Sequence, residues 1–378
     1  MKKLTAVILS LVMIITVFAG CNAAQNNENQ NTNSTVSSSS QEIRTVYPVD
    51  TTVDIHTKKQ SSYLTKSGLS TIFYSNGKKE NSRPEAVEFQ WDSGTLSENT
   101  EYVVDISENE DMTDSISYST SSQTLEVYNL KIATTYYWTV SADGETSSVA
   151  EFTTTSVAPR NLYVDGVTNV RDLGGRKTEN GTITEQGLIY RCGRLNESSA
   201  ETVHIEITED GIQTMRDQLG IKSEIDVRKV DDGEVGAITA SPLGDDIHYF
   251  SCPMEWEGNT FIDNREQLLK VFEILSNRDN YPVIFHCNIG TDRTGMIAFL
   301  VNALLGVPEE DLFKDYLFSN FANIGGTRKI SQLKESGYYT AVMQAEGDSL
   351  REKTYNCLVE FGVPSEQLDS IISILSGK

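Results

Sequence analysis

Basic residues are scarce in this chain of 378 residues. Lysine and arginine number 31 against 54 aspartates and glutamates, which gives a formal net charge of −23. A nucleic-acid-binding protein needs a basic face to displace counterions from phosphates, so this balance argues against nucleic acid as a partner. Net charge constrains the whole surface and not one site, so a local basic pocket for a small anion is compatible with it.

Histidine is also scarce. The four histidines, at positions 56, 204, 248 and 286, lack the spacing of metal ligands. We therefore predict no metal site and no other cofactor.

The amino terminus has the pattern of an export signal. Two lysines precede an uncharged apolar run over residues 4–19, and Gly20-Cys21 follows. A short basic region, an apolar core and small residues at its end are typical of a signal peptide, which we predict over residues 1–20. The small residues before Cys21 resemble a bacterial lipoprotein signal, in which that cysteine becomes the lipidated amino terminus. The resemblance implies an anchor on the outer face of the cell membrane. The alternatives are a plain secretory peptide and an uncleaved anchor helix.

Three further regions follow the signal. Residues 21–43 are almost without apolar side chains, which predicts a flexible polar tether. The remaining length is enough for two domains. We predict an all-β domain over residues 44–157 and an α/β domain over residues 158–378, with few contacts across the linker at Ala158-Pro159.

Short apolar runs bounded by Gly, Ser, Asn and Asp recur in the first domain. Val87, Phe89 and Trp91 alternate with polar residues, and Asp143-Gly144 marks a tight hairpin turn. Strands are predicted over residues 86–91, 101–106, 123–130, 134–142 and 149–154, and their spacing favours a β-sandwich.

This region resembles a fibronectin type III domain. Trp91 resembles the core tryptophan of an early strand, and LKIATTYYWTV resembles the stretch with the tyrosine corner, which makes Tyr136 the corner residue. No residues that carry chemistry are visible here. A spacer is therefore favoured over carbohydrate or protein binding.

Strands alternate with helices in the second domain. Buried strands are predicted over residues 220–227 and 281–286, and apolar residues at helical spacing predict helices over residues 265–277, 293–306 and 308–320. This order favours a parallel sheet with helices on both faces. The reactive site of such a sheet lies beyond the carboxyl ends of its strands.

One loop at such an end, within VIFHCNIGTDRTG (residues 283–295), combines a thiol with a guanidinium. A strand that turns at once into a helix leaves backbone N–H groups facing one point, which together with the positive helix end form an anion site. Arg293 can grip two phosphate oxygens. Cys287 lies in the same positive field, which favours its thiolate. The loop is therefore predicted to bind phosphate and to attack it.

Three other residues support this loop in the sequence. Gly290 allows the tight curvature, Thr294 can donate its hydroxyl to the sulfur, and His286 can brace the loop from behind. The alternative is a buried cysteine that packs as a small hydrophobe beside a solvated arginine. The complete pattern between an apolar strand and an apolar helix favours catalysis.

The loop resembles the signature of cysteine-dependent tyrosine phosphatases. More narrowly it is similar to a bacterial and fungal family whose loop reads His-Cys-x-x-Gly-Lys-Asp-Arg-Thr-Gly. The resemblance continues in VTNVRDLGG (167–175), GLIYRCGRL (187–195), LGIKSEIDVR (219–228) and LLGVPEEDLFKDYL (304–317). It implies a protein tyrosine phosphatase-like fold over the second domain.

The resemblance also implies roles for single residues. Cys287 is the nucleophile, Arg293 is the phosphate clamp, and the loop between them supplies the backbone donors. Residues expected to contact the substrate are Asn288, Ile289, Gly290, Thr291 and Thr294, and those in flanking motifs are Asn169, Arg171, Asp172, Asp226 and Arg228.

The sequence departs from this family at two positions. Thr291 stands where the family has Lys, and the lost cation should weaken binding of multiply phosphorylated substrates. Cys192 stands where Ser is common. With Cys252 and Cys357 it is interpreted as a buried apolar thiol, although an oxidising compartment permits disulfides, including a reversible one that protects Cys287.

Three carboxylates compete for the role of general acid, which must protonate the leaving group. The resemblance favours Asp292, within the loop. Glu255 is the second choice because related phosphatases carry their acid on a loop at about that distance before the cysteine. Asp226 is the third, and it can instead hold Arg228.

The sequence thus predicts an exported, membrane-anchored phosphatase that hydrolyses phosphotyrosine or related phosphomonoesters. Two alternatives are a phosphoinositide or inositol phosphate phosphatase and a catalytically silent surface binding protein.

Overall fold

The computed structural model describes residues 42–69, 76–93, 100–196, 205–229 and 238–377. The predicted signal peptide, the lipidation site Cys21 and nearly all of the predicted tether lie outside these residues. Within them, no helix is both long and apolar enough to cross a membrane.

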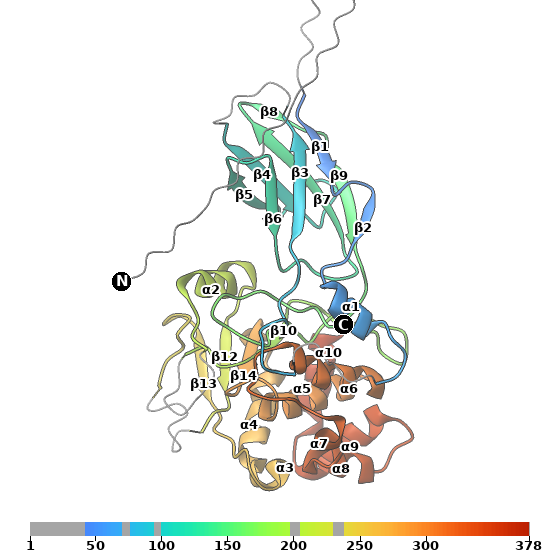
Figure 1. Ribbon diagram of the computed structural model, residues 1–378. Coiled ribbons are helices and arrows are strands. Elements are labelled where there is room, and N and C mark those ends of the chain that lie inside the picture. The colour runs from blue at the N-terminus through green and yellow to red at the C-terminus, as the bar shows by residue number, and fades with distance from the viewer. Residues whose placement is uncertain (1–41, 70–75, 94–99, 197–204, 230–237, 378) are drawn as a thin grey trace, which may run out of the picture. The chain divides into compact units, whose positions relative to one another are not determined.

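The N-terminal region contains two β-sheets (Figure 1). One has the order β1 (Arg44–Tyr47), β3 (Val87–Asp92), β6 (Thr124–Val127). The other has the order β2 (Thr51–Val53), β9 (Ala150–Thr154), β7 (Thr135–Ala142), β4 (Tyr102–Ser107), β5 (Ile116–Thr120), with β8 (Glu145–Thr146) paired to β7. The five strands predicted here are present, while β1, β2, β5 and β8 lie outside the predicted runs.

The buried faces of both sheets share one core. Val87, Phe89 and Trp91 are buried along β3, as their alternation predicts, and Trp138 of β7 packs edge-to-face against Phe89. The hydroxyl of Tyr136 accepts a hydrogen bond of 2.7 Å from the backbone N–H of Lys131. A tyrosine corner makes such a bond to backbone a few residues upstream. Membership of the fibronectin type III family stays a prediction.

The sheet of the α/β domain has the order β10 (Arg171–Asp172), β11 (Ile189–Cys192), β14 (Val283–His286), β12 (Ser223–Asp226), β13 (His248–Ser251). Its last four strands are parallel, as predicted, whereas β10 pairs antiparallel to β11 at one edge. The central strand β14 has a neighbour on each side and all four of its residues are buried.

Alternate residues of these strands enter different cores, so the sheet is covered on both faces. Ile189, Val283 and Phe285 pack with the helices, whereas Tyr190 and Ile284 pack with Met215 and the loops around it. The helical segments are α2 (Glu209–Gln213), η1 (Thr214–Gln218), α3 (Thr260–Asp263), α4 (Arg265–Ser276), η2 (Arg278–Asn280), α5 (Arg293–Leu304), α6 (Glu309–Phe318), η3 (Ser319–Phe321), α7 (Ile330–Lys334), α8 (Gly337–Gln344), α9 (Leu350–Phe361) and α10 (Ser365–Leu375).

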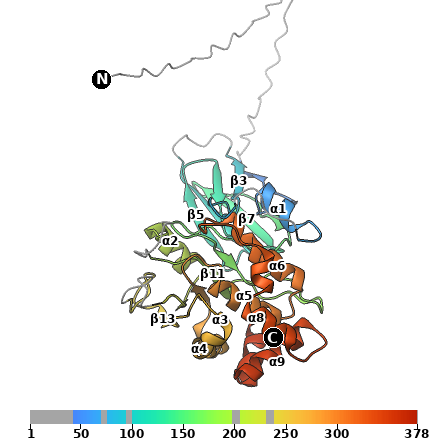
Figure 2. The ribbon, with the colours of Figure 1, turned by 60° about the horizontal axis from the view of Figure 1, so that its bottom comes forward.

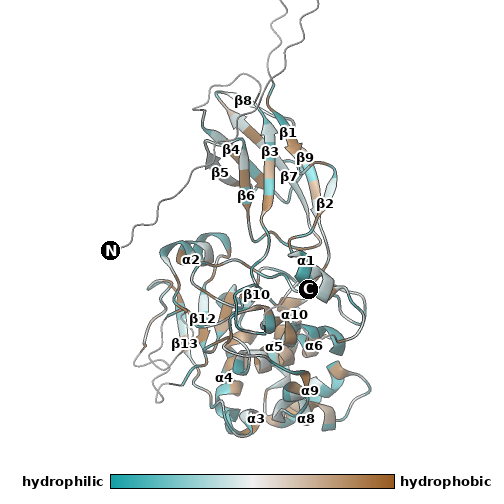
Figure 3. Ribbon diagram, viewed as in Figure 1, coloured by the Kyte–Doolittle hydropathy of each residue, from teal (hydrophilic) through white to brown (hydrophobic). Residues whose placement is uncertain are grey.

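Helix α5 lies inside the helical layer. Every one of its residues is buried, and Figure 3 shows it largely in the hydrophobic colours. A helix that is apolar all round is a core helix rather than an amphipathic surface helix. The three helices predicted from apolar spacing correspond to α4, α5 and α6.

The neighbours of α5 are α6 and α9, which pack directly against it, and Figure 2 shows α5 close to α6.

A segment of the N-terminal region packs into the second domain. Helix α1 (Lys58–Leu64) follows β2, and its residues Tyr63 and Leu64 are buried in the core that the helices form on the α/β sheet. Buried polar contacts add to this packing, because Arg160 donates to the carbonyl oxygens of Leu130 and Asn129. The expectation of few contacts across the linker is therefore wrong. The cause is the segment between β2 and β3, which leaves the sandwich and contains α1. Alternation along strands does not predict such a segment. The boundary at residues 157 and 158 stays a prediction.

Candidate active site

The predicted loop lies at the carboxyl end of the central strand. Strand β14 ends at His286, helix α5 begins at Arg293, and residues 287–292 connect them. Gly290 has a φ of 68°, and a Cβ atom there would lie 2.3 Å from the carbonyl oxygen of Cys192. Only glycine fits this position, so the tight curvature predicted from the sequence is present.

Side chains behind the loop hold its carbonyl groups. Asn169 donates to the carbonyl oxygens of Ile289, at 3.2 Å, and Gly290, at 3.0 Å. Arg191 also donates to the carbonyl oxygen of Gly290, at 2.7 Å. The N–H of a trans peptide points away from its carbonyl, so these contacts turn the loop's N–H groups toward the opposite side. This arrangement suits an anion.

A buried cluster of arginines adds positive charge under the loop. Arg171, Arg176 and Arg191 each contact the carboxylate of Asp315, at 3.1, 2.5 and 2.8 Å. Burial raises the pKa of Asp315, but the three guanidinium groups outweigh it and hold that pKa well below its usual range. One carboxylate thus meets three cations, and the excess positive charge favours an anion in the loop.

Cys287 is 2% exposed at the start of the loop. Burial raises the pKa of its thiol, but the charge of Arg293 and hydrogen bonds from Thr294 lower it, and the net shift is downward. The hydroxyl of Thr294 has no oxygen or nitrogen partner among the described residues, so it can donate to the sulfur. The surroundings of Cys287 therefore favour the nucleophilic thiolate.

The guanidinium of Arg293 is held at the side of the loop. Its Nη1 donates to the carbonyl oxygens of Met254, at 3.1 Å, and Val227, at 3.3 Å. The side chain is 4% exposed. These contacts fix the position of the Arg293 guanidinium, whose predicted role is to bind two phosphate oxygens.

His286 braces the loop from behind. Its Nε2 lies 2.9 Å from Glu224 Oε1, and its Nδ1 lies 3.2 Å from the carbonyl oxygen of Cys287. Burial lowers the pKa of His286, but Asp226 and Glu224 raise it, and the net shift is upward. The upward shift favours the charged form of the ring beside the loop.

The side chains of Glu224, Asp226 and His286 lie close enough to hold a metal ion. Asp226 also accepts hydrogen bonds from Arg228 and from the hydroxyl of Tyr249, at 3.0 Å. These contacts already balance the charge of the carboxylate, so the set is suited to an ion-pair network rather than to a dedicated cation site.

The three predicted proton donors have different surroundings. Asp226 is 1% exposed and buried against Arg228, so a leaving group at the mouth of the loop has no access to it. Burial raises the pKa of Asp226, but His286 and Arg228 lower it overall. Glu255 is half exposed and 2.7 Å from Lys229. Asp292 is the residue before Arg293, and both of its carboxylate oxygens accept bonds from Arg328.

The remaining predicted residues divide into two groups. Asn288 accepts a bond of 3.4 Å from Arg194, and Thr291 is fully buried, so both support the loop. Asp172 instead pairs with Arg160, at 2.9 Å, and does not contact the loop. The roles of the loop residues in binding and catalysis stay predictions.

Sequence reasoning gave no role to Asp315, Arg176, Arg191 or Arg328. Two of them stand inside segments that carry the family resemblance, Arg191 in GLIYRCGRL and Asp315 in LLGVPEEDLFKDYL. A signal was therefore present, but only the folded chain shows that the two side chains meet.

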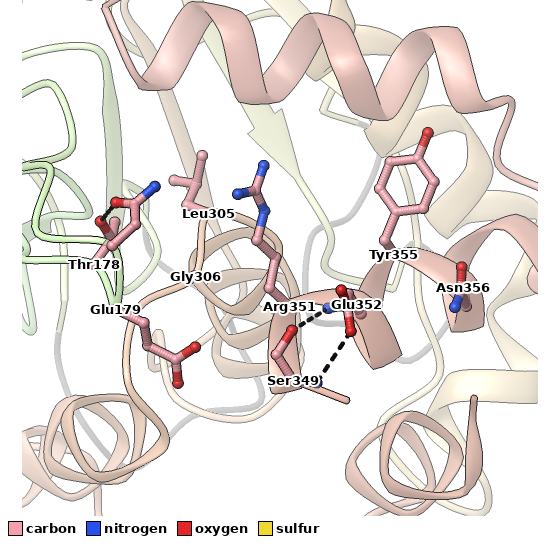
Figure 4. Close-up of a pocket in the computed structure, with 10 residues that line it drawn as sticks. Thr178, Glu179, Leu305, Gly306, Ser349, Arg351, Glu352, Tyr355 and Asn356 are labelled. Carbon is pink, nitrogen blue, oxygen red and sulfur yellow. Dashed lines mark hydrogen bonds between the residues drawn. The ribbon is translucent and has the colours of Figure 1, made fainter. Parts of the chain in front are cut away.

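A separate pocket of about 370 Å³ lies at the other end of α5 (Figure 4). It is lined by Leu305 and Gly306, which follow the helix, and by residues at the start of α9. Ser349 and Glu352 bond each other's backbone N–H groups in a capping box. The loop with Cys287 precedes α5, a helix of 12 residues or about 18 Å. The pocket therefore belongs to a different part of the domain.

Two known proteins are similar to part of this chain. A protein of Cupriavidus necator, named as a candidate tyrosine-protein phosphatase, is 30% identical over 188 residues, which are 43% of this chain and 64% of that protein. A tyrosine-protein phosphatase of Nostoc commune is 35% identical over 66 residues, or 18% of this chain and 21% of the relative. The chain thus spans less than two thirds of either relative.

The crystal structure of TpbA from P. aeruginosa has a TM-score of 0.28 and 18% identity, and the match covers 46% of this chain and 91% of that one. The TM-score is too low to show that the two chains share a fold. The sequence profile described as "Tyrosine phosphatase family" matches residues 162–365, more than half of the chain and the region that holds the loop. This chain belongs to the tyrosine phosphatase family.

Proposed function

We propose that this protein hydrolyses phosphotyrosine-type phosphomonoesters through a phosphocysteine at Cys287. The single observation that carries the proposal is the loop at the start of α5, where the lowered pKa of Cys287 coincides with the clamp Arg293. Membership of the tyrosine phosphatase family supports the same chemistry.

In the first step the phosphate of the substrate binds against the N–H groups of the loop and the fork of Arg293. The sulfur of Cys287 attacks phosphorus, the bond from phosphorus to the ester oxygen breaks, and that oxygen leaves with the bonding electron pair. A proton donor neutralises it, and Asp292 is the donor we propose.

In the second step water attacks phosphorus, and the bond between sulfur and phosphorus breaks. Inorganic phosphate leaves and the thiolate of Cys287 is restored. A phenol, with a pKa of about 10, is easier to expel than the alkoxide of serine. This difference supports phosphotyrosine over phosphoserine as the substrate.

The test is a substrate panel of phosphotyrosine peptides, phosphoserine peptides, phosphoinositides and inositol phosphates, measured in the presence of a chelator. Phosphotyrosine should be hydrolysed fastest. Cys287→Ser should abolish turnover and leave phosphate binding, because Arg293 and the backbone donors remain. Arg293→Lys should also be severe, because an ammonium cannot make the two-pronged contact.

Turnover that survives Cys287→Ser would refute the mechanism. A clear preference for multiply phosphorylated inositols would favour the alternative substrate class. That result would also overturn the argument from Thr291.

We further propose that the protein is exported and held on the outer face of the cell membrane by lipidation of Cys21. The basic, apolar and small residues that precede Cys21 support this proposal. Two or more acyl chains anchor a protein stably, whereas one does not. Cys21→Ala should leave the protein uncleaved or soluble, and unchanged partitioning into detergent would contradict lipidation.

A further inference from the structure

Arg328 reaches the phosphate-binding loop from a distant part of the chain. Its Nε lies 3.0 Å from Asp292 Oδ1 and its Nη2 lies 2.8 Å from Asp292 Oδ2. The side chain of Asp292 is 51% exposed and that of Arg328 is 15% exposed, so the pair lies at the rim of the site. A two-pronged contact of this kind fixes the orientation of a carboxylate as well as its position.

The backbone of Arg328 is also fixed. Asn320 accepts a bond of 2.7 Å from the N–H of Arg328 and donates one of 2.9 Å to its carbonyl oxygen. Asn320 is 1% exposed, and its own carbonyl oxygen accepts from the N–H of Gly77, at 2.9 Å. The anchor of Arg328 therefore depends on a residue of the N-terminal region.

Segment 76–81 holds the loop that carries Arg328. The carbonyl oxygen of Gly77 accepts from the N–H of Ile324, at 2.9 Å, and the carbonyl oxygen of Asn76 accepts from the hydroxyl of Thr327, at 2.9 Å. A Cβ atom at Gly77 would lie 2.2 Å from the carbonyl oxygen of Gly326. Glycine at position 77 thus permits a close approach of two backbones.

We infer that Arg328 is a positioning residue of the phosphatase site, and that segment 76–81 of the N-terminal region holds it in place. Arg328 orients Asp292 over the mouth of the loop, where the leaving group of a bound phosphomonoester lies. The N-terminal region is then part of the working site and not a spacer alone. This inference rests on the proposed function.

The first test is a double-mutant cycle in the full chain with Arg328→Gln and Asp292→Asn. The substrates are a phosphotyrosine peptide and 4-nitrophenyl phosphate, whose leaving group needs little protonation. Each single variant should lower kcat for the peptide by about 10- to 100-fold, as expected for loss of a charge-assisted contact, and lower kcat for 4-nitrophenyl phosphate by less. The double variant should be no worse than the poorer single variant.

Arg328→Lys separates orientation from charge. A lysine keeps the charge but loses the fork, so it should restore only part of the kcat for the peptide. A merely structural role of Arg328 predicts instead an equal loss with both substrates. That result, or additive effects in the cycle, would overturn the inference.

The second test compares two glycines of the N-terminal region. Gly77→Ala should lower kcat for the peptide in the same substrate-dependent way as Arg328→Gln, because the new Cβ displaces the loop. Gly144→Ala is the matched control: Gly144 also has a positive φ, of 87°, but its Cβ would meet nothing within 4 Å. Equal kinetics of the two glycine variants would overturn the role of segment 76–81.

Failure of the proposed function is a distinct outcome. Wild-type turnover of 4-nitrophenyl phosphate that is lost in Cys287→Ser supports that function. If the wild type lacks such turnover, the proposed function fails and the inference fails with it. If the turnover is present and Arg328→Gln retains wild-type kcat for the peptide, the inference alone is wrong.

Discussion

The buried strand positions of the β-sandwich carry aromatic side chains, whereas those of the α/β sheet also carry charges. In the sandwich, Phe89 packs edge-to-face against Trp138, at 5.0 Å between ring centroids, and against Phe152, at 5.5 Å. In the α/β sheet, strand β12 buries Glu224 and Asp226 beside aliphatic residues. Both regions are closely packed, but only one of them buries ionised groups next to a reactive residue.

This difference identifies the site on physical grounds. Aromatic burial stabilises a fold directly, by about 25 cal/mol for each Å² of apolar surface removed from water. A buried charge costs free energy unless other charges and hydrogen bonds compensate it. Charges that a chain keeps buried despite this cost are often found at functional sites. Here they converge on the loop that carries Cys287.

The largest change should follow from Asp315→Asn in the charged region. The substitution leaves Arg171, Arg176 and Arg191 without their shared carboxylate. Removing one partner of a buried ionic cluster costs about 3–5 kcal/mol, which urea denaturation measures. Because Arg191 also holds the carbonyl oxygen of Gly290, kcat/KM should fall at least about tenfold.

The control for Asp315 lies on the same helix. Asp311→Asn changes a carboxylate in the first turn of α6 that is only partly buried, and should cost no more than about 1 kcal/mol. Equal losses of stability in the two variants would show that the buried cluster has no special role.

Trp138→Ala in the sandwich should lower the free energy of unfolding without lowering kcat. Truncation of a buried tryptophan costs about 3–5 kcal/mol, again measured by urea denaturation. The value of kcat for the folded protein at 25 °C should stay within about twofold of wild type, because Trp138 contacts no residue of the loop. A large fall in kcat with the fold intact would show that the core of the sandwich, and not only segment 76–81, affects the site.

The same difference explains what the sequence could predict. Alternation and helical spacing gave the five sandwich strands and helices α4, α5 and α6, because local apolar periodicity reflects burial. The placement of Cys287 and Arg293 on one loop was predictable because both stand in one short segment with a strand before it and a helix after it.

Contacts between distant segments were not predictable in this way. Asp315 and the arginines that it binds stand on different elements, and Arg328 lies 36 residues from Asp292. In the sequence, helix α1 lies between two strands of the sandwich and would be assigned to it. Its residues Tyr63 and Leu64 are instead buried in the core of the α/β domain. Periodicity shows which residues are buried but not which core they join.

The smallest perturbation tests the charged region without unfolding it. Burial raises the pKa of Cys252 and of Cys357 to about 11, whereas the pKa of Cys287 is lowered. A lower pKa means that the thiolate persists to lower pH. The rate of alkylation by iodoacetamide should therefore rise with pH around a midpoint below that of an ordinary thiol, with Cys287 modified first.

Thr294→Val keeps the volume but removes the hydroxyl donor, so it should move this midpoint upward by about one pH unit, since such a bond is worth about 1.5 kcal/mol or more. Mass spectrometry of the modified peptides measures both effects. If another cysteine is alkylated first, or if the midpoint in Thr294→Val equals that of wild type, the electrostatic account of the loop is wrong.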